Sequence, residues 1–202
     1  MDLKKKIALP VILLPVMFSF LMVMAGCSVA LGAFNGTFGS APGSQKESDN
    51  KFSGDCTAKR IETRAQYTQG QFNKIFGPPR SKELQDKLKD ATLLGKKTTT
   101  PVHEKVAACI EAASKEMEAK NVSYKITEFG GYRASDAQIG DRSYHVYGAA
   151  VDINWTKMPY GSTTHDFPKE FEEIMKSHGF YWGFDFSRTK DPHHWEWHGE
   201  KP

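Results

Sequence analysis

Apolar residues in the second half of the chain recur with two different spacings, one typical of helices and one of strands. Between residues 100 and 121 they return every three or four positions, which predicts an amphipathic helix with proline in its first turn. A second helix is predicted to open at Pro168 and to end at Gly179. Segments rich in aromatic and β-branched residues predict strands at 123–129, 148–155 and 194–198. This mixture indicates an α+β domain over residues 100–202.

The first half of the chain divides into three segments of different composition. Residues 1–34 hold three lysines followed by an uncharged apolar run, which is long enough to cross a bilayer. The lysines should remain cytoplasmic and place the rest of the chain outside. Residues 35–55 are rich in glycine and polar residues and predict a flexible linker. Residues 56–99 form an accessory segment, in which Ser81 is expected to cap a helix over residues 82–94.

Three fates of the N-terminal run are compatible with its sequence. We favour a retained membrane anchor, because the apolar run continues past any cleavage point. A lipoprotein signal is the second, since Met-Ala-Gly-Cys at residues 24–27 resembles a lipobox ending in Cys27. The third is a cleaved secretory signal. Because all three export the domain, we expect it at the extracytoplasmic face of the cell envelope.

Charge and cysteine usage narrow the class of protein. The 27 Lys+Arg against 24 Asp+Glu leave a net charge of +3, so no basic face for nucleic acid is expected. We expect a monomer. Cys56 and Cys109 remain for the exported part, where a pair of cysteines more often forms a disulfide than a metal site. Two isolated buried thiols are the alternative.

Candidate chemistry concentrates in two short motifs. His145 and Asp152 lie seven residues apart, and a bend near Gly148 can bring both side chains together before a β-rich stretch. One imidazole and one carboxylate make two of the three protein ligands of a catalytic zinc site. The third would be His194, three residues after Asp191, a carboxylate placed to take a proton from an activated water. The residues alone leave open that these are ordinary exposed histidines.

Ionisable and tryptophan side chains alternate along the last predicted strand. His194, Glu196 and His198 share one face of a strand, while Trp195 and Trp197 share the other. Glu196 or His198 could therefore orient His194.

Three motifs together carry a family resemblance. They are Ser-x-His-x-x-Gly-x-Ala-x-Asp at 143–152, Asp-x-x-His-aromatic-Glu at 191–196, and Gly-Tyr-Arg at 131–133 followed by Gln138. They resemble the zinc peptidases that cut peptidoglycan stems, the VanY-type D-alanyl-D-alanine carboxypeptidase and L-alanyl-D-glutamate endopeptidase family, related in fold to Hedgehog signalling domains. The resemblance spans about residues 100–198, with Trp195 where phenylalanine is usual. It implies a small antiparallel sheet flanked by helices.

The resemblance also implies roles for individual residues. It implies Zn2+ bound by His145, Asp152 and His194, with Asp191 as the base. It implies that Arg133 faces a substrate carbonyl or carboxylate, against the simpler reading of a surface salt bridge. The further substrate-binding candidates are Gln138, Ser143 and Trp182, of which Trp182 could equally belong to the core.

These expectations combine into one leading function and several rivals. The leading function is zinc-dependent hydrolysis of a peptide bond in the peptidoglycan stem peptide. The aspartate at the base position resembles the endopeptidase lysins, so an endopeptidase for wall remodelling or lysis is favoured over a D-alanyl-D-alanine carboxypeptidase. A non-catalytic, zinc-containing wall-binding module is the alternative of another class. A tethered component of an assembly or secretion apparatus is a third possibility.

Overall fold

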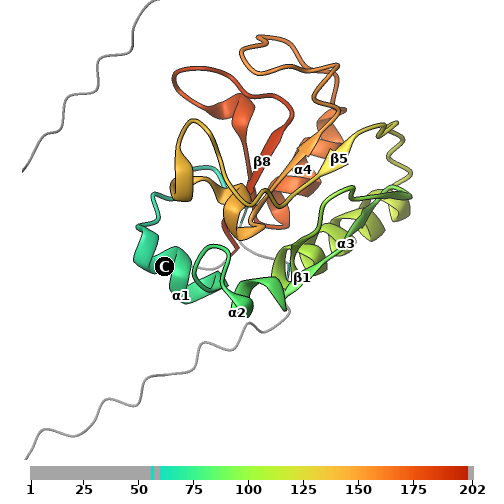
Figure 1. Cartoon of the computed structure of the whole chain (residues 1–202). Coiled ribbons are helices and arrows are strands. Elements are labelled where there is room, and N and C mark those ends of the chain that lie inside the picture. Colours follow the sequence, from blue (N-terminus) through green and yellow to red (C-terminus); the bar gives the residue numbers. More distant parts are fainter. Residues whose placement is uncertain (1–55, 57–59, 200–202) are drawn as a thin grey trace, which may run out of the picture. The chain divides into compact units, whose positions relative to one another are not determined.

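A four-stranded antiparallel sheet, in the order β5-β6-β8-β7, organises the structure (Figure 1). The computed structural model describes residue 56 and residues 60–199. The strands are β5 (Phe129–Gly130), β6 (Ala150–Ile153), β7 (Phe180–Trp182) and β8 (His194–Trp197). In the pairing of β6 with β8, Asp152 lies opposite His194 and Ala150 lies opposite Glu196. Every residue of these two strands is buried, so both faces of the sheet are covered.

Helices and two smaller sheets surround these strands. The helices are α1 (Gln69–Phe76), α2 (Lys82–Gln85), α3 (Glu104–Ala119) and α4 (Lys169–Ser177), with short 3-10 turns η1 (Gly140–Arg142), η2 (Tyr144–Tyr147) and η3 (Gly183–Asp185). The smaller sheets pair β1 (Leu88–Lys89) with β4 (Val102–His103) and β2 (Thr92–Leu93) with β3 (Lys96–Lys97). Helix α3 packs against α4, which in turn packs against β7. The architecture is therefore the mixed α+β class that the sequence predicts.

The predicted anchor (1–34) and linker (35–55) lie outside the described residues and stay predictions. Within the part of the chain that the structure describes, no helix has the length and hydropathy that a bilayer crossing requires.

The accessory segment differs most from its sequence-based prediction. Ser81 does cap a helix, since its hydroxyl accepts from the Leu84 backbone N–H, but this helix ends after Gln85. The predicted helix over 82–94 is therefore wrong beyond its first turn. The rest of that range contains the short strands β1 and β2, because β1 pairs with β4 and a left-handed turn at Leu94 and Gly95 closes the β2–β3 hairpin. Long-range pairing has overridden local helix propensity here.

The long helix begins later than predicted. Thr100-Pro101 does not start α3, because Val102 and His103 are paired in β4 and the His103 ring caps the helix by accepting from the Lys105 N–H. The predicted strand over 123–129 is likewise shorter, with only Phe129 retained in β5. Helix α4 begins directly after Pro168, as predicted.

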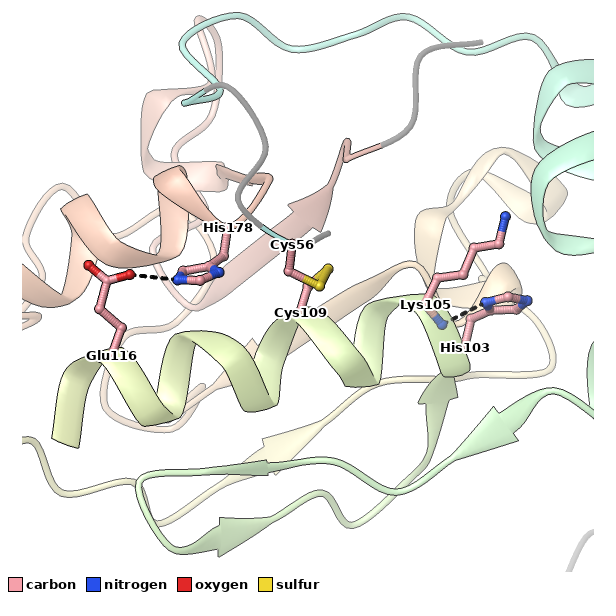
Figure 2. The surroundings of a disulfide bond; sticks show 6 residues. All are labelled: Cys56, His103, Lys105, Cys109, Glu116 and His178. Atoms are coloured by element: carbon pink, nitrogen blue, oxygen red, sulfur yellow. Dashed lines mark hydrogen bonds and ion pairs between the residues drawn. A yellow bond between two sulfur atoms is a disulfide. The ribbon is translucent and has the colours of Figure 1, made fainter. Parts of the chain in front are cut away.

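Cys56 and Cys109 form a disulfide, one of the two alternatives left open by the sequence. Figure 2 shows this bond at the middle of α3, with the His178–Glu116 contact further along the same helix. The bond ties the start of the accessory segment to α3. Side chains of this segment also join the main hydrophobic core: Phe72, Phe76, Leu84, Leu93. Residue 56 and residues 60–99 therefore share one core with the chain that follows them.

Gly148 is the residue that permits the bend between η2 and β6. Its φ of +63° lies in the left-handed region, and a Cβ there would lie 2.7 Å from the His103 backbone nitrogen and 2.9 Å from Leu88 Cδ2. Gly95 also has a positive φ, of +77°, but a Cβ there would meet nothing within 4 Å. The two glycines thus share the backbone constraint and differ in the space around them.

We predict that Gly148→Ala lowers the free energy of unfolding far more than Gly95→Ala does. The left-handed backbone alone costs about 1–2 kcal/mol, and overpacking at residue 148 adds roughly 1–3 kcal/mol. Urea unfolding followed by tryptophan fluorescence measures both. Equal losses in the two variants would contradict the close packing of Gly148 against β4.

Candidate metal centre

Three buried side chains converge where β6, β8 and η2 meet. His145 belongs to η2, Asp152 to β6 and His194 to β8, and their exposed fractions are only 1%, 8% and 8%. The register of the sheet places Asp152 and His194 side by side. The bend at Gly148 returns His145 to the same point. The structure therefore brings together the three residues that the sequence motifs single out.

The three donor atoms of this group are separated by the distances expected for ligands of one small ion. His145 Nε2 lies 3.1 Å from His194 Nδ1 and 3.2 Å from Asp152 Oδ1. His194 Nδ1 lies 2.9 Å from the same carboxylate oxygen. In a tetrahedral zinc site with bonds near 2.0–2.1 Å, neighbouring donor atoms are about 3.3 Å apart. Two nitrogens and one oxygen at these separations fit a divalent cation with little adjustment.

Each imidazole is held in a fixed orientation by an outer partner. His145 Nδ1 lies 2.7 Å from the Gly131 carbonyl oxygen, so it carries the proton and Nε2 presents its lone pair to the centre. His194 Nε2 lies 3.3 Å from Glu196 Oε1 and can donate to it, which leaves Nδ1 for the centre. Glu196 therefore has the orienting position that the strand alternation indicates.

Burial and neighbouring charges set the protonation of the metal-free group. Burial lowers the pKa of His145. For Asp152, burial alone would instead raise the pKa, but the two histidines hold this pKa well below its usual range. For His194, the contacts with Asp152 and Glu196 outweigh burial and raise the pKa to about 10. Near neutral pH the metal-free site thus holds an imidazolium between two carboxylates.

Asp191 lines the same cavity, which has a volume of about 530 Å³. His193 Nδ1 lies 3.2 Å from Asp191 Oδ1, but it donates instead to the Met158 carbonyl at 2.7 Å. Asp191 Oδ1 is buried and accepts no hydrogen bond from the described residues. Burial also raises the pKa of Asp191, against the opposing effect of His194 and His193. This oxygen is therefore well placed to accept a proton.

Gly183 makes room for Asp191. A Cβ on Gly183 would lie 2.5 Å from the Asp191 carbonyl oxygen and 3.0 Å from its Cβ. The Asp191 N–H donates to the Gly183 carbonyl, and the His194 N–H donates to the Asp191 carbonyl. These contacts fix the turn that joins Asp191 to the start of β8.

The substrate-binding candidates occupy different places. Arg133, Gln138 and Ser143 all line the cavity. Arg133 is half exposed, with Nη1 3.4 Å from Asp152 Oδ2. Trp182 is not among the described lining residues; it is buried, stacks on Trp195 with centroids 5.1 Å apart, and donates to the Pro192 carbonyl. This arrangement corresponds to the core alternative for Trp182.

Two residues at this site are not singled out by the sequence motifs. His193 has its Nε2 3.9 Å from Asp152 Oδ1 and only 13% of its side chain exposed. Arg64 contacts Glu196 from 132 residues away. No local sequence pattern marks Arg64. The only hint is the carboxylate of Glu196 within a buried strand, because such a charge needs a cation supplied from another part of the chain.

We predict that zinc uptake by the metal-free protein releases about one proton per ion between pH 6 and 7. The His194 pKa of about 10 lies above this window, so the ring carries a proton on Nδ1 that the metal must replace. Apparent affinity should accordingly rise about tenfold per pH unit. Isothermal titration calorimetry in two buffers of different ionisation enthalpy counts the protons. Uptake without proton release would contradict this protonation state.

Comparison with known proteins identifies the segment that builds the site. Residues 137–197 match a protein-family model described as D-alanyl-D-alanine carboxypeptidase. No curated protein and no solved structure gives a significant match to the chain. The matched segment contains the three converging residues and Asp191, but neither Arg64 nor Arg133. The family resemblance of the sequence motifs is thereby confirmed over residues 137–197, which match the model of the D-alanyl-D-alanine carboxypeptidase family.

Proposed function

We propose that the protein is a zinc metallopeptidase that hydrolyses a peptide bond in the stem peptide of peptidoglycan. The observation that carries this proposal is the convergence of His145, Asp152 and His194 in a cavity that Asp191 also lines, where Asp191 Oδ1 accepts no hydrogen bond from the described residues. The family of residues 137–197 supports a peptide ending in D-alanyl-D-alanine as substrate. The fold relationship to Hedgehog signalling domains is part of the same proposal.

The donor set favours zinc over harder cations. Two imidazole nitrogens and one carboxylate suit Zn2+, whereas Mg2+ and Ca2+ prefer oxygen ligands. Once bound, zinc would polarise the scissile carbonyl and make an attacking water more acidic.

Asp191 is assigned the proton transfers. Its Oδ1, which accepts no hydrogen bond from the described residues, takes a proton from the water whose oxygen attacks the scissile carbon, and the same proton then passes to the departing amine as the C–N bond breaks. The raised pKa of Asp191 favours both steps, because the carboxylate must first accept the proton and then hold it briefly.

We assign to Arg133 the binding of negative charge on the substrate. Its guanidinium is half exposed at the cavity wall, and its main-chain N–H donates to the His145 carbonyl. A guanidinium at this cavity wall can bind the developing oxyanion or a substrate carboxylate. Gln138 and Ser143 line the same wall and complete the proposed substrate contacts.

Two cleavage specificities are candidates for the same machinery. The aspartate at the base position favours an endopeptidase that remodels or lyses the wall. The description of the matched family favours a D-alanyl-D-alanine carboxypeptidase.

The proposed location is the extracytoplasmic face of the envelope, with residues 1–34 as the anchor. The Cys56–Cys109 disulfide supports an oxidising compartment, and peptidoglycan is reached from that side.

Digestion of purified peptidoglycan with the zinc-loaded protein, followed by mass spectrometry of the muropeptides, tests the proposal. We predict shortened stem peptides: loss of one terminal residue marks a carboxypeptidase, and an internal cut marks an endopeptidase. Zinc bound at one ion per chain without any product would favour the wall-binding module instead.

We further predict that Asp191→Asn lowers kcat by roughly 10²–10⁴-fold, because the proton acceptor is lost, while zinc stoichiometry is unchanged. Asp185→Asn is the matched control, since Asp185 is paired with Lys176 and is not among the described residues that line the cavity. An Asp191→Asn variant with wild-type turnover would exclude Asp191 as the base.

A further inference from the structure

An extended segment of the accessory region, residues 60–67, contacts α4 and His198, the residue that follows β8; we call this segment the strap. The Ile61 N–H donates to the Lys176 carbonyl of α4 at 3.2 Å. The Ala65 N–H donates to His198 Nδ1 at 2.9 Å. These main-chain contacts fix the strap at two points, and Arg64 lies next to the second.

Arg64 forms a bidentate ion pair with Glu196. Its Nε donates to Oε2 at 2.7 Å and its Nη2 donates to Oε1 at 2.6 Å. The Glu196 side chain is only 3% exposed, against 37% for Arg64. The guanidinium also lies over the Phe186 ring, 4.4 Å from its centroid. A planar fork held on a ring face fixes the plane of the carboxylate that it binds.

Both oxygens of Glu196 are shared with a histidine. Oε1 lies 3.3 Å from His194 Nε2, and Oε2 lies 3.3 Å from His198 Nε2. Because His198 Nδ1 accepts from the strap, its Nε2 carries the proton and donates to Glu196. The carboxylate is thus held by Arg64 and His198, and its remaining contact is to the ring of His194.

We propose that Arg64 is a positioning residue of the metal centre, acting through Glu196 on His194. It holds the carboxylate so that His194 Nε2 donates to it and Nδ1 points to Asp152 and His145. This role rests on the proposed metal site and gives the accessory segment a part in it. Arg64 lies outside the family-matched residues 137–197, so the strap adds this contact to a site built elsewhere.

Loss of Arg64 should weaken metal binding because Glu196 would lose the two donors that set its plane. The carboxylate could then rotate about its side chain, and His194 would no longer be confined to one ring orientation. Partners that orient a metal ligand in this way typically contribute 10–100-fold to metal affinity.

The test is the zinc dissociation constant of the full chain, measured by competition with a chromogenic chelator. We expect Arg64→Gln to weaken binding by about 10–100-fold. Arg64→Lys keeps the charge but cannot fork, so an intermediate loss is expected. Arg60→Gln is the matched control: Arg60 lies in the same strap and pairs with Glu62 and Glu173 instead. Its affinity should stay within about twofold of wild type, inside the usual context scatter.

The visible spectrum of the cobalt-substituted protein separates positioning from mere loss of stability. If Arg64 positions His194, the changed ligand geometry shifts the band positions in Arg64→Gln and Arg64→Lys. If Arg64 only stabilises the fold, the folded fraction falls and the band positions stay as in wild type. If Arg64→Gln does not fold, Arg64→Lys decides alone. Wild-type affinity and an unchanged cobalt spectrum in the folded variants would overturn the role of Arg64. Failure of wild-type protein to bind zinc would instead overturn the metal site itself.

Discussion

The antiparallel register that sets Asp152 opposite His194 is the constraint on which the site depends. A slip by one residue would turn one of the two side chains to the other face of the sheet, because neighbouring residues in a strand alternate. The third residue, His145, is returned to this pair by the left-handed bend at Gly148. The three converging side chains are thus placed by a buried sheet and one turn.

Around this point, charges of alternating sign follow one another from the partly exposed Arg64 to the buried Asp152. Arg64 pairs with Glu196, Glu196 contacts His194, and His194 contacts Asp152. Burial alone would raise the pKa of Glu196, but His194, His198 and Arg64 hold it below its usual range. A buried carboxylate is tolerated only when such partners surround it. Arg64 of the accessory segment is one of these partners.

The sequence predicts the chemistry of the site better than its surroundings. His145, Asp152 and His194 follow from residue type, spacing and the family motifs, and the α+β class follows from apolar periodicity. The predicted helix over 82–94 is wrong because Leu88 pairs with His103 of β4, and no local sequence pattern indicates so distant a partner. Arg64 and His193 escaped for the same reason, since their roles come from contacts with β8 and Asp152 that only the folded chain supplies.

Anomalous diffraction at the zinc edge from crystals of the zinc-loaded protein tests most directly whether these three side chains bind one ion. One strong peak is expected at about 2.0–2.2 Å from His145 Nε2, Asp152 Oδ1 and His194 Nδ1. A peak bound elsewhere, or zinc contacted by His194 through Nε2 with Glu196 displaced, would contradict this expectation.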